Sequence, residues 1–128
     1  MVREWIIGPP GSTRRQTLAE PALVSALPLD VLKLHQLQIV DGTAMARHYK
    51  EHPDQIPLFA TPQDYATTVI DYIERLRPDI ALERFTSQSP ADLLLAPRWG
   101  MKNYQFTAMF RQMMAQRHTW QGRLWQKE

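Results

Sequence analysis

The stretch Leu29–Val40, LDVLKLHQLQIV, constrains the fold more than any other part of the sequence. Read as a strand, it carries aliphatic side chains on both faces at first and polar side chains, among them His35, Gln36 and Gln38, toward its end. Antiparallel strands with one solvated face alternate apolar and polar residues, whereas parallel strands that are covered on both sides are apolar on both. We therefore predict one parallel strand over 29–40, covered on both faces, with polar groups near its carboxyl end.

Strand-like and helix-like segments alternate along the rest of the sequence. Apolar runs predict further short, buried strands at 5–7, 79–85 and 93–96. Apolar side chains at helical spacing predict helices at about 13–26, 44–50, 62–77 and 103–117. This alternation favours parallel pairing with right-handed crossovers. The predicted fold class is α/β, with three to four parallel strands and covering helices, either as an open sheet or as a part of a TIM-like (β/α) barrel.

Two helix starts carry capping signals. Thr61 precedes Pro62 and Asp64, which is typical of an N-cap, a first helical position and an acid at the positive end of the helix dipole. The side chains expected to face the core from this helix are Tyr65, Val69, Tyr72, Ile73 and Leu76. For the first helix we expect Ser12 or Thr13 as the cap, and Pro21 either kinks that helix or marks its true start. Its apolar side is expected to carry Leu18, Ala22, Leu23 and Ala26.

Length and composition indicate one domain, 1–128, that is large enough for a core. No apolar run approaches the roughly 20 residues that a membrane-spanning helix needs, so we expect no membrane contact. The sequence contains no cysteine, which excludes disulfides, thiolate metal ligands and a thiol nucleophile within it. A reducing, cytoplasmic setting fits this absence.

The net charge of +2 hides a basic C-terminal helix and tail. Residues 98–128 contain six Lys or Arg and a single acid, Glu128, whereas acids outnumber bases in the preceding part. Stacking aromatics beside positive charges are suited to nucleic acid, so Trp99, Trp120 and Trp125 make an RNA-binding module one alternative. A solvated helix face, with the tryptophans covering a sheet edge, explains the same residues without a ligand.

Loops that follow the carboxyl ends of parallel strands are where ligands bind in α/β folds. Here those loops are 8–13, 38–43, 86–90 and 97–100. The first loop, GPPGST, matches neither the Walker A pattern nor G-x-G-x-x-G, so it indicates a place rather than a reaction. His35 is either a core histidine or a catalytic one. His48 and His52 have a spacing that can bind zinc, but no third ligand is near them in the sequence.

Several longer stretches resemble a bacterial family of radical S-adenosylmethionine (radical SAM) proteins. They are IIGPPGST, LDVLKLHQLQIVDGTAMARHY, ERFTSQSPADLLLAPRWGMKNY and the closing TWQG. The family comprises Fe–S oxidoreductases related to coproporphyrinogen-oxidase and elongator-type radical enzymes, and this chain resembles its C-terminal half from about residue 3 to 122. In the first loop the family usually reads I-x-G-L-P-G-E-T, where this sequence has Pro9 and Ser12 in place of Leu and Glu.

The resemblance implies a partial (β/α) barrel with the cofactor at the carboxyl ends of the strands. By analogy, the residues that match the support for the adenosyl part of S-adenosylmethionine, and the neighbouring strand end, are Ile7, Gly8, Pro10, Gly11, Gln36, Leu37 and Gln38. The residues that match positions at the barrel opening, where substrate is expected, are Arg84, Thr86, Gln88 and Trp99. The resemblance assigns no catalytic residue and no metal ligand to this chain.

One departure from the family is decisive for the expected activity. The family holds its 4Fe–4S cluster with three cysteines in a C-x-x-x-C-x-x-C loop, and this sequence has none. The resemblance therefore implies a C-terminal fragment of a radical SAM enzyme that is inactive alone and binds S-adenosylmethionine very weakly. Its expected partner is the missing N-terminal half of the barrel. Besides the RNA-binding module, a homodimer formed through exposed strand edges is the remaining alternative.

Overall fold

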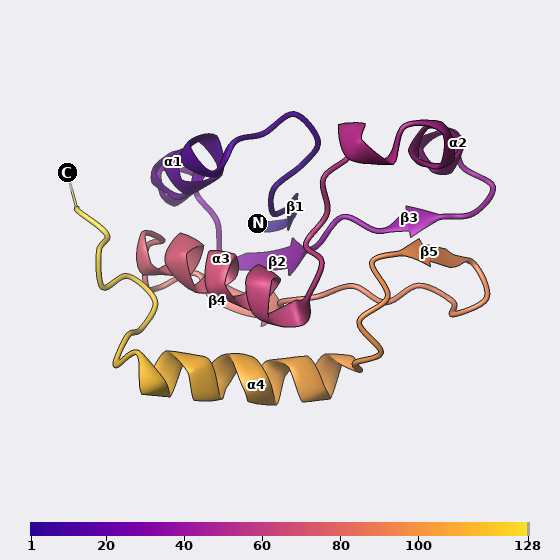
Figure 1. Ribbon diagram of the computed structural model, residues 1–128. Helices are drawn as coiled ribbons and strands as arrows, with labels where there is room; N and C mark the ends of the chain where they lie inside the picture. Colours follow the sequence, from indigo (N-terminus) through magenta and orange to yellow (C-terminus); the bar gives the residue numbers. More distant parts are fainter. Residues whose placement is uncertain (128) are drawn as a thin grey trace.

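A parallel three-stranded sheet forms the centre of the computed structural model, which describes residues 1–127. The strand order is β1-β2-β4, so β2 lies between the other two (Figure 1). The β1–β2 register runs from Val2 opposite Val31 to Ile6 opposite His35. The predicted α/β class with three parallel strands is thereby confirmed. The bounds are Val2–Ile6 for β1, Val31–His35 for β2 and Ala81–Arg84 for β4.

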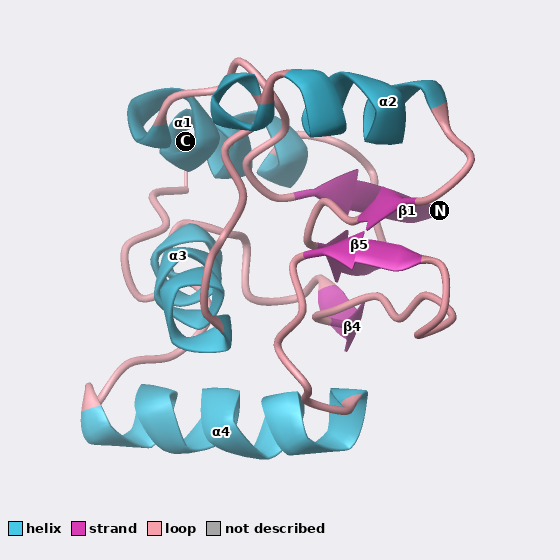
Figure 2. Ribbon diagram, turned by 45° about the vertical axis from the view of Figure 1, so that its right-hand side comes forward, coloured by secondary structure: helices cyan, strands magenta, loops and turns pink. Residues whose placement is uncertain are grey.

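Helices cover one face of this sheet. α1 and α3 lie against that face, and α4 packs against α3 on the side of β4 (Figure 2). The core between them contains fully buried Leu32 and Leu34 from β2, Tyr65 from α3, and Phe106 and Phe110 from α4. Among the described residues no helix covers the opposite face of the sheet (Figure 2). The bounds are Arg14–Ser25 for α1, Pro62–Glu74 for α3 and Asn103–Gln116 for α4.

A separate antiparallel pair, β3 with β5, lies beyond the carboxyl end of β2 (Figure 1). Helix α2 packs on this pair around a second small cluster of buried Ile39, Ala46 and Ile56. Thr43 caps α2, because its hydroxyl accepts a hydrogen bond from the Ala46 N–H at 3.1 Å. This unit therefore flanks the carboxyl edge of the parallel sheet. The bounds are Ile39–Val40 for β3, Ala44–Glu51 for α2, Pro53–Gln55 for a short 3-10 helix and Leu94–Ala96 for β5.

Helix α3 begins and packs as the sequence predicts. The Thr61 hydroxyl accepts a hydrogen bond from the Asp64 N–H at 3.0 Å, and Pro62 occupies the first helical position. The apolar stripe faces the core, and all five of its members are buried: Tyr65, Val69, Tyr72, Ile73 and Leu76. Helices α2 and α4 also lie where they are expected, within one residue at each end.

The prediction of a single strand over 29–40 is wrong, because the chain leaves the parallel sheet after His35. The buried Gln36 side chain is hydrogen-bonded to both the N–H and the carbonyl of Ser87. Residues 36–38 are therefore held against the loop after β4 and do not continue β2. Ile39 then starts β3, which is antiparallel to β5. The expectation of parallel pairing therefore holds for β1, β2 and β4 only.

Coverage of the strands also differs from the prediction. The first strand was expected to be buried, but β1 is an edge strand in which Val2 is 56% and Ile6 41% exposed. β2 is covered on one face only, since its alternate residues are buried and half-buried. The last strand, β5, is half-buried. With helices on a single side, the second face of a three-stranded sheet stays open to solvent.

Helix α1 packs with only part of its expected apolar side: Leu18 packs against the core, whereas Ala22, Leu23 and Ala26 are exposed. Thr13 caps it with reciprocal hydrogen bonds to Gln16, and Pro21 lies inside the helix rather than at its start. The buried residues are Thr17, Pro21 and Val24, whereas Leu23 is 72% exposed. Because positions three and four apart share a helix face, the stripe at 17, 21 and 24 excludes residue 23 from the core.

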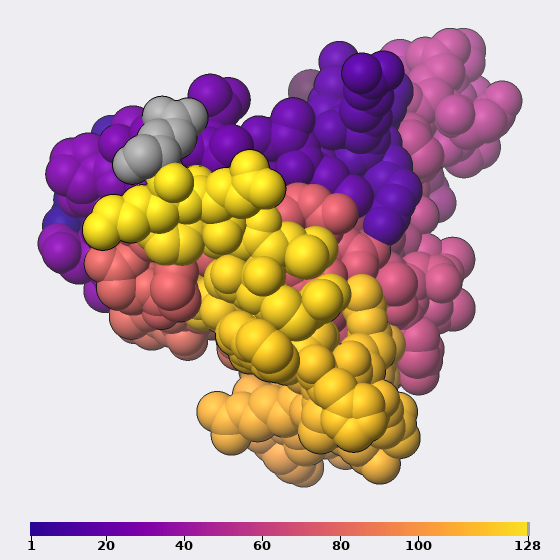
Figure 3. Space-filling view, turned by 90° about the vertical axis from the view of Figure 1, so that its left-hand side faces the viewer, coloured from indigo at the N-terminus to yellow at the C-terminus, as the bar shows by residue number. Residues whose placement is uncertain are grey.

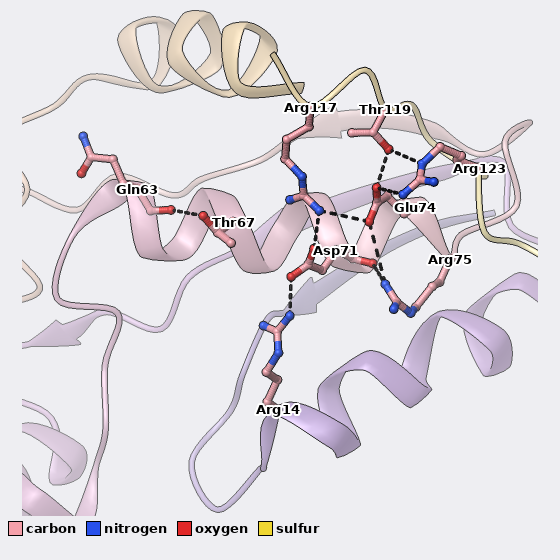
Figure 4. Close-up of polar contacts among 9 residues, drawn as sticks. All are labelled: Arg14, Gln63, Thr67, Asp71, Glu74, Arg75, Arg117, Thr119 and Arg123. Carbon is pink, nitrogen blue, oxygen red and sulfur yellow. Dashed lines mark hydrogen bonds and ion pairs between the residues drawn. The ribbon is translucent and has the colours of Figure 1, made fainter. Parts of the chain in front are cut away.

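The C-terminal tail, residues 118–127, is fastened to α3 by a buried carboxylate (Figure 4). Glu74 accepts hydrogen bonds from the Thr119 hydroxyl and, at 2.8 Å, from Nη2 of Arg123. Nη2 of Arg117 lies 3.4 Å from the same carboxylate. The backbone also contributes, because the Leu124 N–H donates to the Glu74 carbonyl at 2.7 Å. Figure 3 shows the tail, in yellow, running over the surface from the end of α4.

Asp71, one turn earlier in α3, binds Arg117, which also contacts Glu74, and it binds Arg14 of α1. It accepts hydrogen bonds from Arg117 at 2.8 Å and from Arg14. Burial raises the pKa of Asp71, but the hydrogen bonds from Arg14 and Arg117 outweigh this effect and hold that pKa below its usual value. Burial likewise raises the pKa of Glu74, and the hydrogen bonds from Thr119 and Arg123 bring it below its usual value. Two arginines of the basic end are therefore paired within the chain.

Candidate functional site at the carboxyl edge of the sheet

Three segments meet at one edge of the parallel sheet, because they follow the carboxyl ends of its three strands. They are residues 8–12 after β1, 36–38 after β2 and 86–89 after β4. The pairing of β1 with β2 continues one residue beyond β1, since the Ile7 N–H donates to the His35 carbonyl at 2.9 Å. The Ile7 side chain is fully buried. Ile7 thus anchors the first loop to the sheet.

The loop after β1 connects that strand to α1. Gly8 has a φ of +66°, and a Cβ at this position would lie 3.2 Å from the ring of Phe59. Glycine is therefore favoured here both by the backbone conformation and by the close neighbour. Gly8, Pro9 and Ser12 line a pocket of about 230 Å³ together with Phe59. Residues 10 and 11 form the exposed tip of the loop.

Two glutamines tie the segment after β2 to the segment after β4. Nε2 of Gln36 donates to the Ser87 carbonyl at 3.0 Å, and Oε1 of Gln36 accepts from the Ser87 N–H at 2.9 Å. Nε2 of Gln38 donates to the same carbonyl at 3.3 Å, and Oε1 of Gln38 accepts from the Ser89 hydroxyl at 2.7 Å. These amide groups hold the two loops together, so their hydrogen-bonding capacity is largely used within the protein.

The hydrogen-bonded side chains of Gln36 and Gln38, with Ser87 and Ser89, form a polar bridge that lines two pockets. A pocket of about 470 Å³ lies on the side of the loop 97–102. A pocket of about 540 Å³ lies on the side of β1 and the end of β2. The carboxyl edge of the sheet therefore offers two hollows of small-molecule size next to one polar bridge.

The residues assigned to S-adenosylmethionine fall into separate places. Gly8 lines the 230 Å³ pocket, and Pro10 and Gly11 lie at the tip of the same loop. Gln36, Leu37 and Gln38 line the 540 Å³ pocket. Ile7 belongs to the core. Within residues 1–127 these positions share one edge of the sheet but not one pocket, and their cofactor role stays a prediction.

The residues assigned to substrate are also only partly brought together. Gln88 and Trp99 line the 470 Å³ pocket, and the Trp99 indole N–H donates to the Phe59 carbonyl at 3.0 Å. Thr86 is buried, and its hydroxyl donates to Oδ1 of Asn103 at 2.7 Å. Arg84 is exposed on β4. Their substrate role stays a prediction.

Sequence reasoning missed Glu4, Ser87 and Ser89 as residues of the 540 Å³ pocket. The hydroxyl of Ser87 is hydrogen-bonded to Nδ1 of His35, and Oε1 of Glu4 lies 3.8 Å from Nε2 of His35. The spacing of the two serines in SQS carries a signal, since residues two apart point to one side of an extended segment. The contact of Glu4 with His35 depends on the strand register, which the sequence does not display.

The His35 side chain is largely buried and lies near three charged side chains, Glu4, Lys33 and Arg84. Its side chain is 13% exposed. Burial lowers the pKa of His35 below the usual value for histidine, and the positive charges of Arg84 and Lys33 act in the same direction, while Glu4 opposes them. The imidazole is therefore neutral near neutral pH, with one N–H and one free lone pair on its two ring nitrogens.

The residues present do not fit a 4Fe–4S cluster, whose irons are bound by cysteine thiolates, because the sequence contains no cysteine. In the part of the chain that the structure describes, no group of three or more His, Asp or Glu side chains is placed to hold a metal ion. The helices of that part are too short or too polar for any of them to cross a membrane.

The fold and the site define a class of protein: a parallel α/β domain of the (β/α) type with polar loops and pockets at the carboxyl edge of its sheet. Residues 29–116 match the model of the radical SAM C-terminal domain. The chain therefore belongs to this family, and the resemblance seen in the sequence is confirmed.

Longer proteins are similar to this chain over most of its length. It is 25% identical over 122 residues to YtqA of Bacillus subtilis, a match that covers 95% of the chain and 37% of YtqA. It is 30% identical over 95 residues to YhcC of Escherichia coli, covering 73% of the chain and 29% of YhcC. The fold matches the archaeal Elp3 of Methanocaldococcus infernus, solved with an N-terminal deletion, with a TM-score of 0.74 at 12% identity over 94% of the chain and 28% of Elp3. The chain thus spans little more than a third of YtqA.

Proposed function

We propose that the chain supplies the C-terminal wall of a radical SAM barrel whose 4Fe–4S cluster is held elsewhere, and that it is inactive alone. The observation that carries this proposal is a parallel sheet with a free edge and polar pockets at its carboxyl end, in a chain without cysteine. The family match and the greater length of the relatives support it. The cytoplasm, where the cysteines of a cluster stay reduced, is the setting that the proposal requires.

The free edge of β1 is the expected contact with the rest of the barrel. Ile7 directs its N–H toward β2, and backbone groups of successive residues in a strand point to opposite sides. The N–H groups of Val2, Glu4 and Ile6 therefore face the free edge. A parallel strand from the N-terminal half would pair with them and cover the exposed side chains of Val2 and Ile6.

In this arrangement the loops after β1 and β2 bind S-adenosylmethionine, which supplies a reactive radical when a cluster reduces it. Gly8, Pro10 and Gly11 expose backbone at the carboxyl edge, and the space where a Cβ of Gly11 would lie is open. The side chains of Gln36 and Gln38 are engaged with residues 87 and 89. Residues 36–38 would therefore contact the adenosyl group through their main chain and the Leu37 side chain.

The proposed substrate residues lie on the other side of the glutamine bridge. Gln88 and Trp99 offer an amide and an aromatic surface in the 470 Å³ pocket. Arg84 offers a positive charge from β4. Thr86 acts as a positioning residue, because its hydroxyl is engaged with Asn103 at the start of α4.

The test is to co-express the chain with the polypeptide encoded directly upstream and in the same frame, which the proposal expects to contain C-x-x-x-C-x-x-C. The measurements are co-purification, iron content and formation of 5′-deoxyadenosine from S-adenosylmethionine under reducing conditions. We expect the complex to contain iron and to cleave the cofactor, and the chain alone to do neither. Absence of the cysteine motif upstream, or turnover by the chain alone, would contradict the proposal.

A matched pair of variants tests the predicted contact. Ile6→Pro removes the backbone N–H that faces the free edge and keeps the ladder with β2, whereas Ile6→Ala removes only the side chain. We expect Ile6→Pro to abolish co-purification and Ile6→Ala to weaken it. Calorimetry on the isolated chain checks the cofactor separately, since micromolar affinity for S-adenosylmethionine would be inconsistent with a binding site that needs the cluster.

The alternatives give different results in simple assays. A homodimer through the β1 edge predicts a doubled mass in light scattering of the isolated chain, and Ile6→Pro would return it to a monomer. An RNA-binding module predicts affinity that falls steeply with salt. Two of the basic residues that it would use, Arg117 and Arg123, are already paired with acids of α3.

A further inference from the structure

Ser87, His35 and Glu4 form a connected row in the 540 Å³ pocket, and the function proposed above gives none of them a role. The row spans three segments, with Glu4 on β1, His35 at the end of β2 and Ser87 in the loop after β4. His35 uses both ring nitrogens in it, Nδ1 with the Ser87 hydroxyl and Nε2 facing the Glu4 carboxylate at 3.8 Å. A histidine between a hydroxyl and a carboxylate is the arrangement that moves protons in many enzymes.

The groups around His35 keep its ring neutral at rest. Burial disfavours a positive charge on the ring, Arg84 on β4 and Lys33 on β2 act in the same direction, and Glu4 on β1 favours the charge. The ring is neutral at rest, so one nitrogen is free to take a proton. Once protonated, the imidazolium is stabilised by Glu4, which is itself well exposed to solvent. Glu4 therefore offsets part of the cost of placing a positive charge on His35.

The surroundings of Ser87 argue against nucleophilic attack by its hydroxyl. Acyl transfer requires N–H donors aimed at the oxyanion that forms on the substrate. The Ser87 N–H donates to Gln36, and the side-chain amides of Gln36 and Gln38 both donate to the Ser87 carbonyl. These nearby donors are engaged within the protein, so the hydroxyl is better placed to relay a proton than to form an acyl intermediate.

We propose that Ser87, His35 and Glu4 form a proton-transfer site that deprotonates a weakly acidic O–H or N–H group of a ligand in the 540 Å³ pocket. The ligand proton passes to Oγ of Ser87 while the hydroxyl proton of Ser87 passes to Nδ1 of His35. The electron pair of the broken bond stays on the ligand as an anion. The positive charge gained by the imidazole is balanced by the Glu4 carboxylate.

This inference goes beyond the proposed function, which places S-adenosylmethionine at residues 36–38 and substrate in the 470 Å³ pocket, whereas the proton-transfer site opens to the 540 Å³ pocket. It defines the ligand of the 540 Å³ pocket as a small molecule with an ionisable O–H or N–H group. It also makes the polar bridge of Gln36 and Gln38 a positioning element, because these amides fix Ser87 against His35.

The first test is an NMR titration of the His35 ring in the 128-residue chain and its variants. Glu4→Gln removes a negative charge that favours protonation, so the midpoint of His35 should fall by about half a pH unit. Ser87→Ala should shift both the Nδ1 resonance and the midpoint. The control is Glu83→Gln, which removes a carboxylate that lies 3.8 Å from Lys33 and outside the row. An effect of Ser87→Ala no larger than that of Glu83→Gln would overturn the relay.

The second test uses 4-nitrophenol, a weak acid that is coloured only as its anion. At a fixed pH below its midpoint, the wild-type chain and Glu83→Gln should increase the phenolate absorbance. His35→Gln and Ser87→Ala should leave it as in buffer. No increase with the wild-type chain, or an increase that persists without His35, would overturn the proposed ligand class. Neither test involves a cluster or S-adenosylmethionine, so their results are independent of the co-expression experiment.

Discussion

Glu74→Ala removes the buried carboxylate that fastens the C-terminal tail to α3. The Glu74 side chain is 2% exposed and binds both Arg117 and Arg123. Removing one partner of a buried ion pair destabilises a protein by about 3–5 kcal/mol, because the remaining charge is left without compensation. The two arginine side chains are 38% and 37% exposed, so water can rehydrate them in the variant. We therefore expect a loss of about 2–4 kcal/mol.

Thermal and urea unfolding followed by circular dichroism measure this loss. At about 2.1 cal/mol/K per residue, unfolding of the whole chain has an entropy of about 270 cal/mol/K, so a loss of 3 kcal/mol lowers Tm by about 11 °C. The matched control is Glu83→Ala, which removes a 59% exposed glutamate lying 3.8 Å from Lys33. That variant should lose less than about 1 kcal/mol.

Hydrogen exchange locates the effect. The Gly122 N–H donates to the Ile73 carbonyl at 2.9 Å, and the Leu124 N–H donates to the Glu74 carbonyl at 2.7 Å. If the carboxylate holds the tail, both amides exchange faster in Glu74→Ala while the amides of β2 keep their relative protection. A loss no larger than that of Glu83→Ala, with unchanged exchange at these two amides, would refute the reasoning.

Two further predictions concern strain and acid stability. Gly122 has a φ of +88°, and a Cβ there would lie 2.9 Å from Pro78, so Gly122→Ala should lose about 2–4 kcal/mol in urea unfolding. Gly11→Ala, at a φ of +82° with nothing within 4 Å, should lose only about 1 kcal/mol, and equal losses would show that the contact with Pro78 is unimportant. Asp71 and Glu74 have pKa values below the reference values of 3.8 and 4.5, so the stability that they contribute is present above about pH 4.5 and is lost as the pH falls through their folded-state pKa values. Urea unfolding between about pH 5 and pH 3 should therefore show a falling free energy of unfolding, with a shallower slope in Asp71→Asn.

Helix α3 shows which structural features can be predicted from residues that are close in the sequence. Its cap, its first-turn proline and its buried stripe all depend on residues within four positions of one another. Such interactions form whatever the rest of the chain does, so the sequence displays them. Helix α1 carries equally local capping signals, yet its residue pattern does not display which side faces the core, because Pro21 is buried and Leu23 is exposed.

The end of β2 shows where local reasoning fails. The apolar pattern continues through Ile39, so the sequence reads as one strand to Val40. The strand ends at His35 because Gln36 binds Ser87, which is 51 residues away. A strand has no internal hydrogen bonds, and its length is decided by which backbone and side chains lie beside it.

The candidate site divides in the same way. Its place at the carboxyl edge follows from the order of strands and helices, which is a property of the sequence. Its family motifs, such as KLHQLQIV and SQSPADLLLAPRWG, are likewise visible in the residues. The contacts of His35 with Ser87 and Glu4 follow only from the register of β1 against β2 and from the path of the loop after β4.

The sequence by itself determined the α/β class, the helices with local caps, the family and the absence of any thiolate that could bind a cluster. The tertiary structure alone decided which face of the sheet is covered, where β2 ends and which polar side chains meet. The physical reason is range: helical periodicity and residue chemistry are expressed within a few positions, whereas sheet pairing and pockets depend on residues far apart in the chain.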